Sequence, residues 1–72
     1  MDEQKILDNF GINFKHYRNK AKMSQDDVVE LTGFSKSYIS NVESAKHNIS
    51  LVNALKFASI VNKTIDEMIK DL

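Results

Sequence analysis

Apolar side chains recur every three or four residues along almost the whole chain, and no stretch alternates cleanly between apolar and polar positions. This spacing predicts amphipathic α-helices, whereas alternation would indicate β-strands. Near the N-terminus one helical face would carry an apolar stripe that consists of Leu7, Phe10, Phe14, Tyr17 and Ala21. The sequence therefore predicts an all-α fold, a compact bundle of helices.

The first two predicted helices are delimited by residues that favour helix ends. The first extends over about residues 3–22 and contains Gly11. Because glycine costs a helix interior about 1 kcal/mol relative to alanine, Gly11 indicates a close packing contact or a break. The second begins after Ser24, which has capping-box spacing with Asp27. It ends at Gly33, which readily adopts the left-handed conformation found at helix C-termini.

Three further helices complete the predicted bundle. Ser35 caps a third helix over about residues 36–44, and Ser50 caps a fourth. Thr64 caps a fifth, with Glu67 at the capping-box position. The core stripe of the fourth helix is expected to consist of Leu51, Ala54, Ala58 and Val61.

The turn between the second and third predicted helices is short and contains Gly33. Two short helices joined by such a turn form the pattern of a helix-turn-helix, here over about residues 24–44. The outer face of the third helix would present small polar side chains that suit base edges and phosphates: Ser37, Ser40, Asn41 and Ser44. Serine and asparagine are poor helix formers, so their presence at exposed positions of a helix indicates a functional role. In a helix-turn-helix that role would be binding of double-stranded DNA.

Length and charge limit the alternatives. The 72 residues leave room for one domain, 1–72, with a core of marginal stability. Its 10 basic and 10 acidic residues give a net charge of zero, which argues mildly against a nucleic-acid partner. The charge is uneven, however, because residues 15–22 carry basic side chains and no acidic ones. A basic face therefore remains compatible with overall neutrality.

Catalytic and metal-binding patterns are missing from the sequence. The chain has no cysteine, and its two histidines, His16 and His47, are far apart. We therefore expect no enzyme activity, no metal and no cofactor. The charged N-terminus and the absence of a long apolar run predict a cytoplasmic protein without a leader or membrane span. A protein-interaction module, such as an antitoxin with secondary DNA binding, remains the alternative function.

Four segments resemble the Cro/repressor-type helix-turn-helix family, also called the xenobiotic-response-element family. They read FGINFKHYR at 10–18, MSQDDV at 23–28, TGFSKSYISNVE at 32–43 and SLVNALKFA at 50–58. Within this family, VESAKHNISLVNALK at 42–56 is similar to the controller proteins of restriction–modification systems. That similarity implies a homodimeric regulator of its own promoter. A phage, plasmid or chromosomal repressor is the more general alternative, and an activator would also contact RNA polymerase.

The resemblance implies roles for individual residues. Base readout in the major groove would fall to Lys36, Ser37 and Asn41. Contacts with the DNA backbone would fall to Gln25, Ser35, Tyr38, Ser40, Lys46, His47 and Asn48. Lys36 could instead hold a phosphate, and the ring of Tyr38 could simply pack against the third helix. No metal ligand is implied.

The resemblance also implies an ion pair between Arg18 and Glu43, which would tie the first helix to the third. The chain departs from the family where glycine is common, at Lys22 and Ala45, so we expect the local geometry of both turns to differ from that of the family.

The last two predicted helices, over about residues 50–72, carry more apolar side chains than one small core can cover. We expect the surplus to form a homodimer interface, which would consist of Val52, Leu55, Ile60, Ile69 and Leu72. The alternative is that these residues are core or scattered surface positions.

Overall fold

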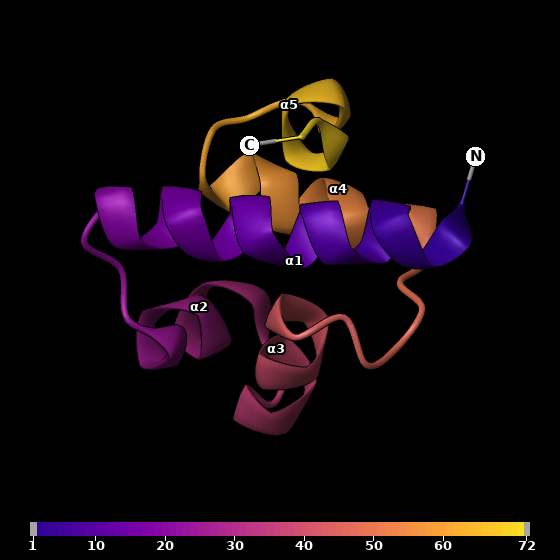
Figure 1. Ribbon diagram of the computed structural model, residues 1–72. Helices are drawn as coiled ribbons and strands as arrows, with labels where there is room; N and C mark the ends of the chain where they lie inside the picture. Colours follow the sequence, from indigo (N-terminus) through magenta and orange to yellow (C-terminus); the bar gives the residue numbers. More distant parts are fainter. Residues whose placement is uncertain (1, 72) are drawn as a thin grey trace.

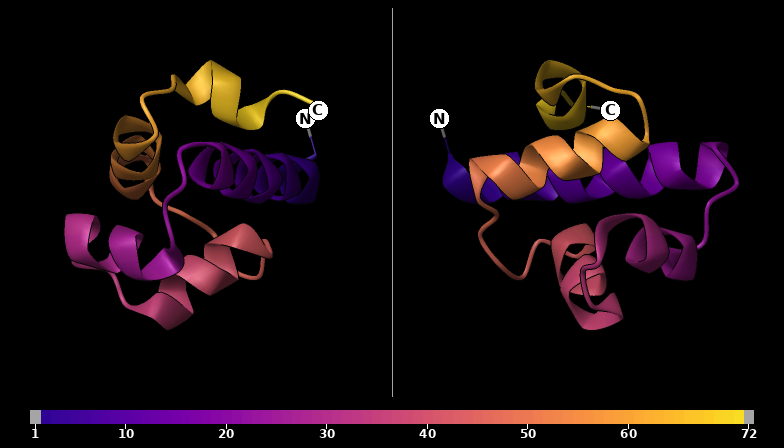
Figure 2. Two further views of the ribbon diagram at one scale, coloured as in Figure 1. Left: turned by 90° about the vertical axis from the view of Figure 1, so that its left-hand side faces the viewer. Right: turned by 180° about the vertical axis from the view of Figure 1, so that it is seen from behind.

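The protein is described by a computed structural model over residues 2–71, a range that contains helices and no strands. The helices are α1 (Glu3–Lys20), α2 (Gln25–Thr32), α3 (Lys36–Glu43), α4 (Leu51–Ile60) and α5 (Ile65–Ile69). Helix α1 crosses the middle of the molecule, with α2 and α3 on one side and α5 on the other (Figure 1). Helix α4 runs beside α1 (Figure 2). The predicted all-α class is confirmed.

Side-chain caps set the starts of α2, α3, α4 and α5, as the sequence predicts. The caps whose hydroxyl groups accept a hydrogen bond from the first turn are Ser24, Ser35, Ser50 and Thr64. Both predicted capping boxes are present. In the second box, the backbone N–H of Thr64 donates to Glu67 and thereby lowers the pKa of that carboxyl group below its ordinary value. Gly33 ends α2 in the left-handed conformation, with φ 77°.

The C-terminal end of α1 differs from the prediction. The helix stops at Lys20, so Ala21 is exposed and does not extend the apolar stripe. Lys22 adopts a left-handed backbone conformation, with φ 59°, and the turn closes through a hydrogen bond from the N–H of Met23 to the carbonyl oxygen of Arg18. Lys22, where the family resemblance implies a common glycine, therefore adopts a backbone conformation that glycine favours.

Aromatic rings fill the centre of the core. Phe57 of α4 is fully buried, and its ring meets that of Phe14 of α1 edge to face, 4.8 Å between centroids. The other buried hydrophobic residues are Phe10, Val28, Ile39, Val42, Ala54, Ala58, Val61 and Met68. Leu51 was predicted to be part of this core, but the structure shows that prediction to be wrong. Its side chain lies in the first turn of α4 and is 69% exposed.

A close packing contact and a pair of hydrogen bonds fix α1 to its neighbours. Gly11 packs against α3 so closely that a Cβ atom would lie 2.6 Å from the carbonyl oxygens of Val42 and Glu43. Of the two explanations for a glycine within the helix, the close packing contact is therefore correct, and α1 continues through Gly11 without a break. On the opposite side, the fully buried Asn13 donates hydrogen bonds of 2.8 Å to the carbonyl oxygens of Met68 and Lys70 at the end of α5.

Candidate nucleic-acid interface

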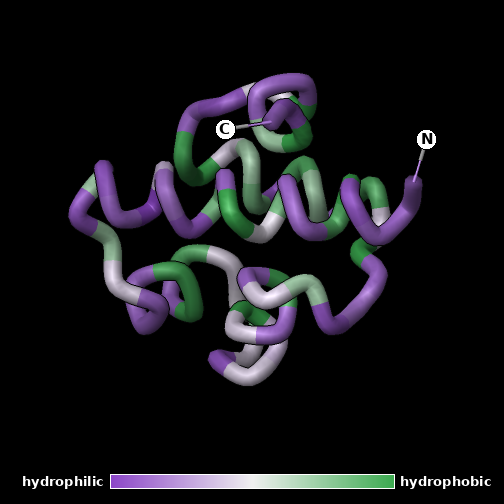
Figure 3. The backbone as a smooth tube through the Cα atoms, viewed as in Figure 1, coloured by the Kyte–Doolittle hydropathy of each residue, from purple (hydrophilic) through white to green (hydrophobic). Residues whose placement is uncertain are grey.

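Helix α3 lies at the edge of the molecule farthest from α5 (Figure 1). Its inner face is held by Ile39 and Val42, which are 0% and 3% exposed. Its outer part is coloured white to purple in Figure 3, as expected for residues of intermediate to hydrophilic character. Of the outer side chains, Ser37 and Ser40 are exposed and Asn41 is half-buried. The arrangement presents a row of short polar groups on a helix whose other side is anchored.

A buried ion pair fixes the orientation of α3 relative to α1. The Arg18 guanidinium binds the Glu43 carboxylate through two contacts, Nε–Oε2 at 2.6 Å and Nη2–Oε1 at 3.1 Å. The two side chains are only 9% and 5% exposed. Arg18 also donates to the carbonyl oxygen of Met23, and Gln25 donates its side-chain amide to Glu43 Oε1 at 3.1 Å. The cluster therefore joins α1 to α3 through paired charges, and α2 to Glu43 of this pair through the neutral amide of Gln25.

Lys36 stands on the side of α3 that faces α2. Its ammonium group is 3.2 Å from a carboxylate oxygen of Asp26, in the first turn of α2. Both side chains are more than half exposed, so the pair is weak and leaves the lysine free to exchange partners. Ser35 beside it caps α3 with its hydroxyl group and accepts the N–H of Tyr38.

Tyr38 stands on the opposite side of α3, against α4. Its ring is half-buried and packs on Phe34, 5.1 Å between centroids, and more loosely on Phe57, 6.1 Å away. Its hydroxyl oxygen accepts a hydrogen bond of 3.1 Å from the side-chain amide of Asn53 in α4. Sequence reasoning missed this role of Asn53, because the spacing of residues within one helix says nothing about polar contacts with another.

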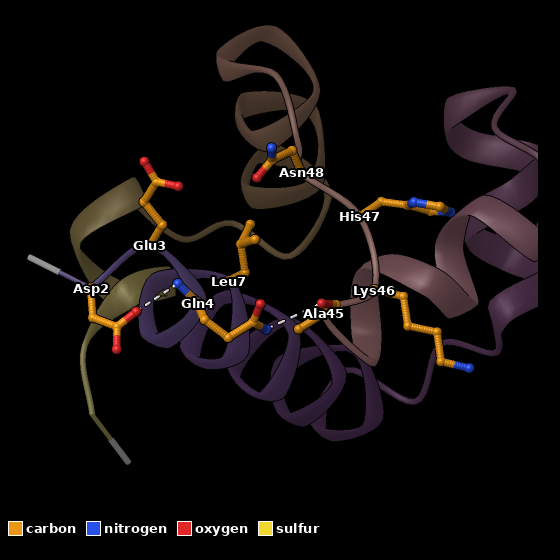
Figure 4. Close-up of a pocket in the computed structure, with 8 residues that line it drawn as sticks. All are labelled: Asp2, Glu3, Gln4, Leu7, Ala45, Lys46, His47 and Asn48. Atoms are coloured by element: carbon orange, nitrogen blue, oxygen red, sulfur yellow. Dashed lines mark hydrogen bonds between the residues drawn. The ribbon is translucent and has the colours of Figure 1, made fainter.

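The loop after α3 supplies the three remaining polar candidates, Lys46, His47 and Asn48, all exposed. The loop borders a shallow pocket of about 500 Å³ at the start of α1, where Gln4 donates a hydrogen bond to the carbonyl oxygen of Ala45. Lys46 and His47 extend away from the acidic rim of this pocket (Figure 4). Both side chains are therefore exposed to solvent.

Exposed apolar side chains gather on the first half of α4. Leu51, Val52 and Leu55 are 69%, 62% and 50% exposed, and their spacing places them on neighbouring positions of the helix surface. Ile60 and Ile69 are half-buried against the core and contribute less free surface than the sequence indicated. Leu72, the fifth predicted interface residue, lies outside the described residues.

Residues 2–71 contain no cluster of three His, Asp or Glu side chains suited to a metal ion. No helix in the described part of the chain is long and apolar enough to cross a membrane.

The chain belongs to the helix-turn-helix family, which it matches over residues 14–68. It is a DNA-binding helix-turn-helix regulator of the restriction–modification controller type. Both the predicted fold class and the predicted family are thereby confirmed.

Individual controller proteins show how far the similarity extends. The control protein C.SmaI of Serratia marcescens is 29% identical over 69 residues, which cover 96% of this chain and 79% of that protein. The control protein C.MunI of a Mycoplasma species is 32% identical over 64 residues, 88% of this chain and 86% of that protein. The crystal structure of the controller protein C.AhdI from Aeromonas hydrophila has a TM-score of 0.78 and 34% identity, and the match covers 86% of this chain and 94% of that chain.

Proposed function

We propose that this protein acts as a homodimer, inserts α3 of each protomer into the major groove and reads a two-fold symmetric operator. The observation that carries the proposal is the outer row of α3, where short polar side chains stand on a helix anchored by buried contacts. Such a helix brings its side chains close enough to hydrogen-bond base edges. Rigid attachment through Arg18 and Glu43 would hold that helix in a fixed register.

Within this proposal the polar residues divide into two groups. Lys36, Ser37 and Asn41 read bases, with Lys36 suited to guanine acceptors and Asn41 to adenine. The backbone contacts are Gln25, Ser35, Tyr38, Ser40, Lys46, His47 and Asn48. Because Gln25 is bound to Glu43 and Ser35 caps α3, these two side chains would meet phosphates while keeping their internal hydrogen bonds.

The dimer in this proposal forms mainly through the exposed apolar residues of α4, with Ile60 and Ile69 at its margin. Pairing of two copies across a two-fold axis would place the α3 helices about 34 Å apart, one turn of DNA. Sedimentation of the Leu55→Lys variant tests the interface, with Leu31→Lys as the matched control on α2, where Leu31 is 60% exposed. We expect a monomer for the first variant and a dimer for the second. A strict monomer for the unaltered chain at micromolar concentration would contradict the dimer.

The operator is proposed to lie at the protein's own promoter, as suggested by its similarity to controller proteins. Selection of binding sites from a random DNA library, followed by sequencing, tests the function. A two-fold symmetric motif that also occurs upstream of the gene would support the proposal. Enrichment of no motif would contradict it and favour the protein-interaction alternative.

A further inference from the structure

The hydrogen bond between Asn53 and Tyr38 determines which further hydrogen bonds the tyrosine hydroxyl group can make. A tyrosine hydroxyl group has one proton to donate and lone pairs to accept. In the structure the Asn53 amide donates to the Tyr38 oxygen at 3.1 Å, so it occupies an acceptor position. The hydroxyl proton therefore remains available for a partner that only accepts hydrogen bonds.

The position of this hydroxyl is fixed from several sides. The Tyr38 ring packs edge to face on Phe34 and lies against Phe57, and the Asn53 backbone is held by the Ser50 cap at the start of α4. These contacts leave the tyrosine few rotamers to lose when a partner binds. A preorganised donor of this kind gains more from each hydrogen bond than a flexible side chain does.

The surrounding charge favours an anionic partner. Within α3 and α4 the only acidic residue is Glu43, and its carboxylate is already paired with Arg18. On the same side of the molecule, the ammonium group of Lys56 lies over the Phe34 ring, 5.6 Å from its centroid. A phosphate oxygen next to Tyr38 would thus meet a free donor and no unpaired carboxylate from these two helices.

We propose that Asn53 is a positioning residue for DNA recognition, whose amide orients the Tyr38 hydroxyl so that its proton is donated to a phosphate oxygen of the operator backbone. This inference rests on the proposed function and assigns Asn53 a part in it. Asn53 itself does not contact the phosphate. It connects α4, which carries the exposed apolar residues Val52 and Leu55, to the recognition helix.

Replacing Asn53 with Asp tests the proposal, because aspartate has nearly the same shape but accepts where the amide donates. In Asn53→Asp the hydroxyl would donate to the new carboxylate and be lost to the DNA. The variant is compared with Tyr38→Phe and with the double variant on the selected operator. Unfolding and sedimentation measurements establish that each variant is folded and has the oligomeric state of the unaltered chain.

We expect Asn53→Asp to weaken operator binding about tenfold or more, the range for a hydrogen bond to a charged group. In the Tyr38→Phe background, Asn53→Asp should reduce the operator affinity much less, because no tyrosine hydroxyl remains to be diverted and only the added negative charge weakens binding. An equal loss in both backgrounds would overturn the proposal, since Asn53 would then act by charge or folding alone.

The partner of the hydroxyl is identified with operators that carry a neutral methylphosphonate at one phosphate at a time. For the unaltered chain we expect weaker binding at one particular phosphate in each half-site, and for Tyr38→Phe no further loss at that phosphate. If the loss of affinity caused by Tyr38→Phe instead disappears when one particular base of the operator is replaced, the hydroxyl binds that base and the phosphate assignment is wrong. Failure of the proposed function is distinguishable, because the unaltered chain would then select no operator at all.

Discussion

Gly11 of α1 lies directly against the backbone of Glu43 in α3, with no room for even one methyl group between them. The same residue, Glu43, binds Arg18 of α1 through its side chain. Helix α3 is thus held to α1 by a steric fit and by an ion pair, both at Glu43. Substitutions at either contact should disturb the position of α3 as well as stability.

Gly11→Ala is expected to destabilise the protein. The added Cβ would clash with the backbone carbonyl oxygens of Val42 and Glu43. Overpacking of this kind costs about 1–3 kcal/mol, whereas the higher helix propensity of alanine contributes about 1 kcal/mol in the opposite direction. Because the contact is with rigid backbone, we expect the cost to exceed the gain. Urea unfolding measures the change. Asn19→Ala, at an exposed position of α1, is the control and should be neutral or stabilising. An increase in stability for Gly11→Ala would show that the two helices do not pack as described.

Glu43→Gln should lower the free energy of unfolding by about 3 kcal/mol or more, because it leaves the Arg18 charge buried without its counterion. The matched variant is Glu30→Gln, at an exposed position of the neighbouring helix α2, for which a change near zero is expected. Urea unfolding of both proteins gives the comparison. A change within error for Glu43→Gln would reject a buried, energetically coupled pair.

Asn13→Ala should destabilise the attachment of α5. Two carbonyl oxygens, of Met68 and Lys70, would lose their donor, and a buried polar group without a partner costs about 1–3 kcal/mol. Hydrogen exchange should show the loss of protection concentrated in residues 65–69. Uniform loss of protection over all helices would indicate instead that α5 unfolds only together with the rest of the core.

Ala45→Gly is expected to stabilise the turn after α3. Ala45 has a φ of 60°, a region that costs an L-residue with a side chain about 1–2 kcal/mol. Glycine avoids that cost but loses about 0.5–1 kcal/mol through the entropy of the unfolded chain, so we expect a net gain of up to about 1.5 kcal/mol. Thermal unfolding measures it. Ala21→Gly, where φ is −82°, should instead be destabilising, and the same sign for both variants would contradict the explanation.

The starts of α2, α3, α4 and α5 were predictable from the sequence, because each depends on residues three positions apart. Ser24 with Asp27 and Thr64 with Glu67 show this directly. The C-terminal end of α1 and the extent of the core stripe on α4 were not predictable in this way. Periodicity shows which residues share a helix face, but it does not show how much of that face a neighbouring helix covers. Ala21 and Leu51 continue the apolar pattern, yet both are exposed.

Within the candidate site, the helix-turn-helix and its polar row followed from local pattern and family resemblance. The polar contacts made by Asn13 and Asn53 did not, because each joins helices that are distant in sequence. The pairing of Asp26 with Lys36 is of the same kind. Such partners become visible only once the helices are placed relative to one another.

We propose sequence-specific reading of DNA by α3. Its most direct test is the ratio of affinities for the selected operator and for a scrambled duplex of the same base composition, measured over a range of salt concentrations. We predict a ratio of about 10³ or more, with both affinities falling steeply as salt rises. Equal affinity for the two duplexes would contradict the account, because charge attraction alone would then explain the binding.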